Sequence, residues 1–292
     1  MLRPIDISPG VCAFAARTPT LPPATHTNSY ALGERDVVLV EPATPYDDER
    51  REWLAWADGL RSSGRRLVAI VLTHHHIDHV GGAEFLATEL GLPLWAHDVT
   101  AARLPELSIA RRLEDGEALT LDGPSPQQWT VLHTPGHAPG HVCLHERALG
   151  TVVVGDMVAT EGTILVETHD GDMRLYLEQL ERLKGLGTRS ALPAHGVPIA
   201  DPAALFTHYV HHRLEREQKV LAALRTAGPE GATPAELVGT AYDDAPPSIW
   251  GIAQMSLEAH LVKLAGDGLA STDGRRYRTV EHRPPTPRRR DP

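Results

Sequence analysis

The densest group of chemically active side chains lies at residues 73–82, where the chain reads THHHIDHVGG. Four imidazoles and one carboxylate fall within six residues there, and burying them is costly unless a cation compensates. In an extended turn, His74 and His76 project to the same side and can share one ion, whereas Asp78 and His79 can face a second ion. Imidazole and carboxylate are both zinc ligands. An exposed, metal-sequestering histidine tract is the weaker alternative.

The elements around this stretch favour a built site. An apolar, β-branched run at residues 67–72 predicts a strand buried on both faces. Gly81 and Gly82 interrupt the pattern, and residues 83–90 can begin a helix. The histidines therefore lie in a strand-to-helix turn.

Three later segments carry candidate ligands, and each lies beside a predicted strand. His137 is in a loop rich in proline and glycine, Asp156 ends an apolar run, and His195 follows another short strand. Each short motif alone is usually structural. In this order, after His-x-His-x-Asp-His, they indicate one shared site.

The remaining pattern predicts a β-sheet core flanked by helices. Predicted strands cover residues 26–33, 36–41, 94–97, 119–121, 129–133, 142–145, 151–154 and 190–193. Predicted helices cover residues 48–61, 100–112 and 176–183. The short spacing of the strands between residues 119 and 154 favours antiparallel pairing.

Composition is that of a globular protein, with 292 residues, 41% hydrophobic and 23% charged. Cys12 and Cys143 are the two cysteines, so no disulfide framework is expected and a reducing compartment fits. The N-terminus lacks an apolar run of signal-peptide length, and no run approaches a membrane span. We therefore expect a cytoplasmic protein without a membrane partner.

The net charge of −10 is unevenly distributed. Residues 208–292 hold 12 Lys and Arg against 11 Asp and Glu, about +1, which leaves 16 against 27, or −11, for the rest. Phosphate contacts dominate affinity for nucleic acids. The acidic main body therefore makes a nucleic-acid partner less favoured than a small-molecule substrate.

The ordered ligand set resembles the metallo-β-lactamase superfamily; it comprises His74, His76, Asp78, His79, His137, Asp156 and His195. This resemblance implies an α/β fold of the αββα type, two packed sheets with helices outside. It implies that His74, His76 and His137 hold one zinc ion. Asp78, His79 and His195 would hold the second, with Asp156 bridging. Ligand type alone leaves iron and manganese open.

The chemistry implied is hydrolysis by a metal-bridging hydroxide, because a bound water ionises near neutral pH. Asp78 and His195 are the predicted catalytic residues, and Asp78 can orient the hydroxide while serving as a ligand. His141, four residues after His137, is predicted to hydrogen-bond to a ligand and orient it. Where many members carry Asp-Thr-Gly after an early strand, this chain has Glu41-Pro42-Ala43, so the usual support beneath the histidine turn is not predicted.

The C-terminal region predicts a second, smaller domain. A long amphipathic helix, a helix start at Thr233-Pro234, a helix at residues 256–268 and a hairpin at Asp273-Gly274 make a winged helix. This arrangement resembles the β-lactamase-like protein 2 group of the superfamily. We predict a catalytic domain at residues 1–204, a winged helix at 205–281 and a disordered tail at 282–292.

Three functions remain in view. The favoured one is a hydrolase with two zinc ions acting on a small ester, thioester, lactone or amide. The second, a single-strand-selective endoribonuclease, is implied by the resemblance, because members of that group cleave single-stranded RNA, and Arg275, Arg276 and Arg278 could contact phosphate. For the winged helix itself, packing on the catalytic domain is favoured over nucleic-acid binding. The third and weakest is a DNA-binding regulator with a vestigial metal core. Nothing in the sequence specifies the oligomeric state.

Overall fold

The computed structural model describes residues 3–280, so the predicted disordered tail lies outside the described residues. The chain divides into two compact units, one ending at His211 and the other beginning at His212. Helix α6 (Pro202–Thr226) crosses this division. The predicted domain boundary after residue 204 falls within this helix and stays a prediction.

The first unit contains a seven-stranded sheet in chain order. Its strands are β1 (Ile5–Ser8), β2 (Val11–Arg17), β3 (His26–Leu32), β4 (Asp36–Val40), β5 (Arg66–Leu72), β6 (Leu94–His97) and β7 (Ile109–Leu113). Strands β1 to β4 pair antiparallel, whereas β4 to β7 pair parallel. The parallel half has helices between its strands because each parallel crossover needs a long connection.

A five-stranded sheet forms the second layer, in the order β12-β11-β10-β9-β8. Its strands are β8 (Ala118–Leu121), β9 (Gln127–His133), β10 (Val142–Glu146), β11 (Thr151–Gly155) and β12 (Ser190–Pro193). As the strand spacing predicted, β8 to β11 pair antiparallel, and only β12 joins β11 in parallel.

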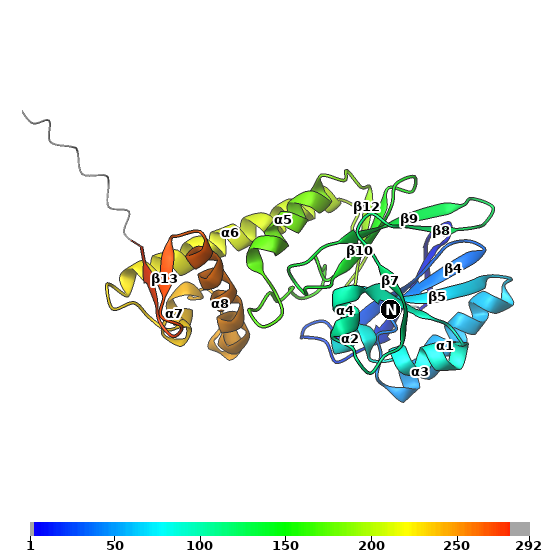
Figure 1. The fold of residues 1–292 in the computed structure, drawn as a ribbon, viewed down its shortest axis with the longest axis horizontal. Helices are drawn as coiled ribbons and strands as arrows, with labels where there is room; N and C mark the ends of the chain where they lie inside the picture. The colour runs from blue at the N-terminus through cyan, green and yellow to red at the C-terminus, as the bar shows by residue number, and fades with distance from the viewer. Residues whose placement is uncertain (1–2, 281–292) are drawn as a thin grey trace, which may run out of the picture. The chain divides into compact units, whose positions relative to one another are not determined.

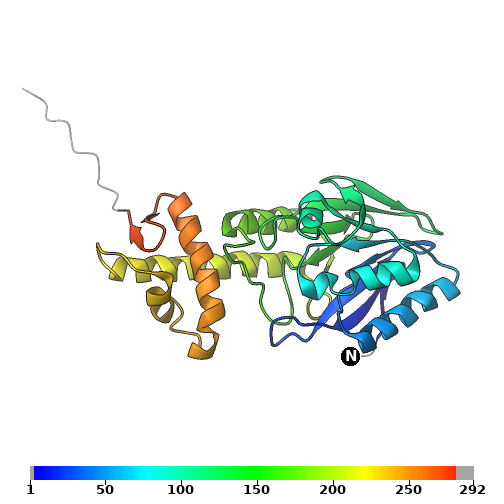
Figure 2. The same cartoon turned by 60° about the horizontal axis from the view of Figure 1, so that its bottom comes forward.

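The core lies in two layers. Side chains such as Val38, Val71, Trp129 and Leu144 fill the space between the sheets, and burying an aliphatic side chain of this size contributes about 1.5–3 kcal/mol. Helices α1 (Asp47–Ser62) and α3 (Ala83–Leu90) cover the outer face of the first sheet (Figure 1). Figure 2 shows α1 lying along this face from a second direction. Helix α5 (Met173–Lys184) packs on the other sheet, where Arg182 donates to the carbonyl of His133. This is the predicted αββα arrangement.

One predicted element is wrong. Residues 100–112 do not form a helix: α4 (Asp98–Ala102) is a single short turn, and the chain then enters β7. Exposure alternates along β7 before Leu113, which is buried in the core between the sheets. β7 is an edge strand with one face toward solvent, so exposure alternates with a period of two residues along it. Pairing with β6 stabilises this extended conformation.

The second unit contains α7 (Pro234–Ala241), the short 3₁₀ helix η1 (Pro247–Ile249), α8 (Trp250–Gly266), β13 (Ala270–Thr272) and β14 (Tyr277–Thr279). A capping box closes the start of α7, where Thr233 and Glu236 each bond the other's backbone. Strands β13 and β14 form an antiparallel hairpin. Helices α6, α7 and α8 together with this hairpin make the predicted winged helix. Helix α8 begins earlier than expected. Among the described residues, no helix is long and apolar enough to cross a membrane.

Candidate metal centre

The seven predicted ligands follow the carboxyl ends of four strands. His74 to His79 occupy the turn after β5, which includes the short helix α2 (Ile77–Val80). His137 follows β9, and Asp156 and His195 follow β11 and β12. The distances below place all seven side chains together. This end of the two sheets therefore carries the candidate site.

The first cluster consists of three imidazole nitrogens. Nε2 of His74 lies 3.0 Å from Nδ1 of His76 and 3.3 Å from Nε2 of His137. The nitrogens of His76 and His137 are 3.0 Å apart. Ligands at zinc–nitrogen distance around a tetrahedral ion are about 3.3 Å apart. The spacing therefore fits three ligands of one ion.

The second cluster joins Asp78, His79 and His195. Oδ2 of Asp78 is 3.6 Å from Nε2 of His195 and 3.8 Å from Nε2 of His79. Asp156 lies between the clusters: its Oδ1 is 3.5 Å from Nε2 of His79, and its Oδ2 is 3.5 Å from Nε2 of His137. One carboxylate thus faces both groups, the geometry of a bridging ligand.

The ring nitrogens that face away from the clusters have acceptors of their own. Nδ1 of His137 donates to the carbonyl of Leu165 at 2.8 Å, and Nδ1 of His195 donates to the carbonyl of His26 at 3.0 Å. When one nitrogen of a neutral ring carries the proton, the other presents a lone pair. These contacts therefore point lone pairs of His137 and His195 inward, as supporting partners of metal-bound histidines do.

Glu41 supplies the support that the sequence did not predict. Its side chain is buried, Oε2 lies 3.2 Å from Nδ1 of His79, and Oε1 accepts a hydrogen bond from Thr73. The hydroxyl of Thr73 in turn accepts from Nδ1 of His74 at 3.0 Å. One carboxylate therefore contacts His79 directly and reaches His74 through the hydroxyl of Thr73. The available signal in the sequence was an acidic residue directly after β4.

His141 lies beneath Asp156. Its side chain is fully buried, Nδ1 is bonded to the hydroxyl of Thr134 at 2.8 Å, and Nε2 accepts from the backbone N–H of Asp156 at 3.1 Å. Gly155 has a φ of 47°, and a Cβ there would lie 2.5 Å from Nε2 of His141. Glycine is thus required for this approach. The contact reaches the backbone of Asp156, and an orienting role for His141 stays a prediction.

The two halves of the site differ electrostatically. Burial, reinforced by neighbouring histidines, lowers the pKa of His74 well below its ordinary value, and burial lowers the pKa of His137 to about 4. Although burial acts against it, the carboxylates of Asp156 and Glu41 raise the pKa of His79 well above its ordinary value. His74 and His137 thus offer neutral rings, and the carboxylates beside His79 provide negative charge that attracts a cation.

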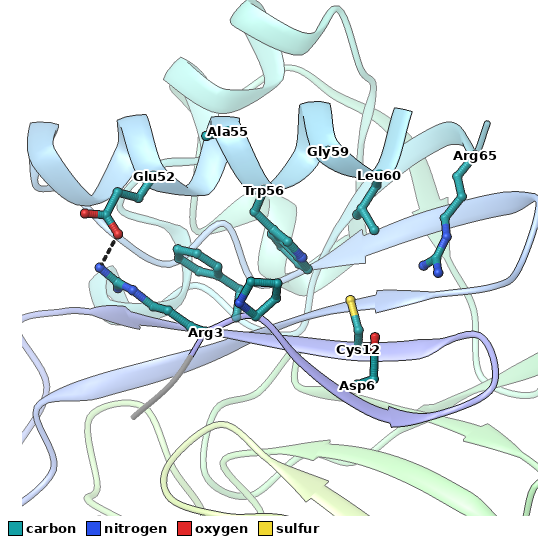
Figure 3. A pocket seen from close by; sticks show the side chains of 11 residues that line it. Arg3, Asp6, Cys12, Glu52, Ala55, Trp56, Gly59, Leu60 and Arg65 are labelled. Atoms are coloured by element: carbon teal, nitrogen blue, oxygen red, sulfur yellow. Dashed lines mark hydrogen bonds and ion pairs between the residues drawn. The ribbon is translucent and has the colours of Figure 1, made fainter. Parts of the chain in front are cut away.

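A separate cleft contains none of these groups. It measures ≈ 460 Å³ and lies between α1 and the first two strands, lined by Trp56, Cys12 and Arg65 among others (Figure 3). Burial raises the pKa of the Cys12 thiol, and a thiol is a weaker nucleophile than a thiolate. Among the described residues that line this cleft, none is a predicted site residue.

Two packed sheets define a class of metal-dependent hydrolases when imidazole and carboxylate clusters follow the carboxyl ends of their strands, as they do here after β5, β9, β11 and β12. Residues 22–195 match the family model described as the metallo-beta-lactamase superfamily, and residues 233–278 match the beta-lactamase associated winged helix domain. The chain belongs to the metallo-β-lactamase superfamily and is a hydrolase of this family.

Named relatives span most of the chain. It is 28% identical over 256 residues to a beta-lactamase-like protein 2 homolog from Drosophila melanogaster, covering 83% of each chain. It is 29% identical over 273 residues to an atrochrysone carboxyl ACP thioesterase from Aspergillus chevalieri, covering 89% of this chain and 82% of the relative. A metallo-beta-lactamase family protein from Thermus thermophilus has 26% identity and a TM-score of 0.75, covering 93% of this chain and 99% of that one.

Proposed function

We propose that the chain is a zinc-dependent hydrolase with two ions per chain, acting on an ester-type bond of a small molecule. The observation that carries this proposal is the inward convergence of five imidazoles and two carboxylates at one end of the sheets. A buried group of this kind needs positive charge to compensate its carboxylates. His74, His76 and His137 would hold one ion, and Asp78, His79 and His195 the other, with Asp156 between them.

The donor set supports zinc. Imidazole and carboxylate ligands without a thiolate suit zinc that keeps one position open; iron and manganese accept the same donors. When bound, the two ions supply Lewis acidity and a water acidic enough to ionise near neutral pH.

Asp78 and His195 are proposed as the catalytic residues. The side chain of Asp78 is 15% exposed, compared with 10% for Asp156 and 6% for His195. Its carboxylate is thus the more accessible of the two in the ligand set, and it can accept a hydrogen bond from an attacking water and orient it. His195 follows β12, its Nε2 lies 3.6 Å from Oδ2 of Asp78, and its Nδ1 donates to the carbonyl of His26.

Among small substrates, a thioester is favoured. A relative that aligns over 89% of this chain is named an acyl-carrier-protein thioesterase. A thioester carbonyl suits a site with two Lewis acids and an orienting carboxylate, because attack places negative charge on the carbonyl oxygen. Esters, lactones and amides share that geometry and belong in the same screen.

Three arginines of the winged helix supported the endoribonuclease alternative. Two of them already have acidic partners: Nη2 of Arg276 is 3.1 Å from Glu236, and Nη2 of Arg278 is 3.1 Å from Asp273. The exposed residues of α8 include Ile252, Met255 and Val262. Phosphate binding requires basic groups rather than apolar ones, so these contacts support a small-molecule substrate over RNA or DNA.

A substrate screen tests the proposal. Purified protein loaded with zinc should hydrolyse at least one of a panel of acyl thioesters, esters, lactones and amides, and activity should disappear with a chelator and return with zinc. Short single-stranded RNA belongs in the panel as the competing substrate. Turnover of RNA alone would replace the proposed substrate class, and no metal-dependent turnover of any member would refute the hydrolase proposal.

A further inference from the structure

Asp170 lies in a segment with no predicted role, between β11 and α5, yet it contacts the histidine turn. Its side chain is 6% exposed, and its Oδ2 lies 2.9 Å from Nε2 of His76 and 3.1 Å from Nε2 of His75. Its Oδ1 lies 2.6 Å from Nη1 of Arg103, beyond the end of α4. The carboxylate therefore receives donors on both oxygens.

The segment is fixed on the site by its backbone as well. The carbonyl of Leu165 accepts from Nδ1 of His137 at 2.8 Å, and the N–H of Asp172 donates to the carbonyl of Gly136 at 2.8 Å. Asp172 then caps α5 by accepting from the N–H groups of Arg174 and Leu175. Asp170 thus lies on a tethered loop and not at a free tip.

We propose that Asp170, with one oxygen engaged by Arg103, is the positioning residue that fixes the tautomer of His76 for metal binding. This inference rests on the proposed metal site. An ionised carboxylate only accepts hydrogen bonds, so Nε2 of His76 must carry the proton that it shares with Oδ2. Nδ1 is then left with its lone pair, and Nδ1 is the atom that lies 3.0 Å from the facing nitrogens of His74 and His137.

Arg103 would decide which way an amide side chain at position 170 is turned, and this can be tested. Asparagine has one acceptor oxygen and one donor NH₂, and a guanidinium can only donate. In Asp170→Asn the amide oxygen therefore turns toward Arg103 and the NH₂ toward His76. That donor requires a lone pair on Nε2 and moves the ring proton to Nδ1, the atom needed for the metal. Removing the guanidinium as well frees the amide to rotate and present its oxygen to His76.

The experiment measures zinc affinity of the full chain by competition with a chromogenic chelator, together with zinc stoichiometry. D170N should weaken one of the two zinc equivalents about 10-fold to 100-fold, the range seen when a supporting partner of a metal ligand is lost. R103M alone should change the affinity less than D170N does. The double variant R103M/D170N should recover most of the loss, which a role limited to structural support would not produce.

Asp172→Ala is the matched control, since it removes the α5 cap from the same loop without touching His76. It should lower thermal stability and leave zinc affinity unchanged. Two tightly bound zinc ions in D170N, or a double variant no better than D170N, would overturn the proposal. If D170N does not fold, near-wild-type zinc affinity of the double variant supports the assignment and a weakened equivalent refutes it. Wild-type protein that binds no zinc would refute the metal site itself, a distinguishable result.

Discussion

Both units bury histidines completely, and the surroundings of those rings differ. In the first unit His74 is fully buried, with Nδ1 bonded to Thr73 and Nε2 facing two other imidazole nitrogens. In the second unit His260 on α8 is equally buried. Among the described residues, neither of its ring nitrogens has a hydrogen-bond partner. Its Nδ1 is 3.7 Å from Oε2 of Glu217, a carboxylate that Lys263 contacts at 2.9 Å.

Burial alone therefore does not identify a metal ligand. A ring at a metal site has an acceptor on its outer nitrogen and a point of convergence on its inner one. His74 has both features, whereas His260 has one distant carboxylate, already contacted by Lys263. The first arrangement fits a cation, whereas the second has no convergence of ligand atoms among the residues that the structure describes.

The largest expected effect is at the residue between the two clusters. Asp156→Ala removes the carboxylate that faces both His79 and His137. Activity should fall by more than the roughly 100-fold that loss of a supporting partner costs, and zinc content should fall below two per chain. Asp78→Ala should likewise lose activity and most of one equivalent. Full activity with two bound zinc ions in the Asp156 variant would contradict a bridging role for Asp156.

Metal removal should lower the stability of the first unit and leave that of the second unchanged. A ligand present at 1,000 times its dissociation constant stabilises the folded state by about 4 kcal/mol, equivalent to a shift of about 10 °C in unfolding temperature for a unit of this size. Chelation should therefore lower hydrogen-exchange protection around β5 and β11 in the first unit. Protection of α8 should not change. Equal losses in both units would contradict a metal site confined to the first.

Glu41→Gln tests the carboxylate that contacts Thr73 and His79. The amide cannot accept on both sides, so it cannot serve Thr73 and His79 together. Zinc affinity should fall about 10-fold, as measured by chelator competition. Glu49→Gln is a suitable control, since Glu49 is also a buried carboxylate of the first unit but bonds Arg3 instead. Unchanged zinc affinity in the Glu41 variant would contradict its supporting role.

The smallest effect concerns His260. Burial, with a contribution from the charge of Arg213, lowers its pKa in the folded chain, whereas the unfolded chain titrates near 6.5. Below about pH 6.5 the unfolded state binds the proton more readily, so stability falls as the solution is acidified. When the pH is lowered from 7 to 5, the free energy of unfolding of His260→Leu should therefore rise by about 1 kcal/mol relative to that of the wild type. Denaturant unfolding at both pH values measures this; an equal slope with pH in both proteins would contradict it.

Much of the fold followed from local pattern. The apolar run before His74, the alternation between residues 119 and 154, and the cap at Thr233 are short-range signals, and each predicted element formed. The segment 100–112 failed because pairing of β7 with β6 decides its conformation. Such tertiary selection overrides local propensity.

The same difference between local pattern and tertiary contact applies to the candidate site. The ordered ligand set was visible because its spacing matches a family pattern, and the distances bring the seven side chains together. Asp170 left no signal, because it lies 94 residues from His76 along the chain and meets it only after folding. Glu41 was visible as an acidic residue, but its contact with His79 depends on the pairing of β4 with β5.

Anomalous diffraction from crystals of the zinc-loaded chain would locate the metal ions at this site. We expect two zinc peaks, the first about 2.0–2.1 Å from the facing nitrogens of His74, His76 and His137. The second should contact Asp78, His79 and His195, with Asp156 between the two. Zinc found only on exposed histidines, or no zinc at this end of the sheets, would contradict the proposed metal site.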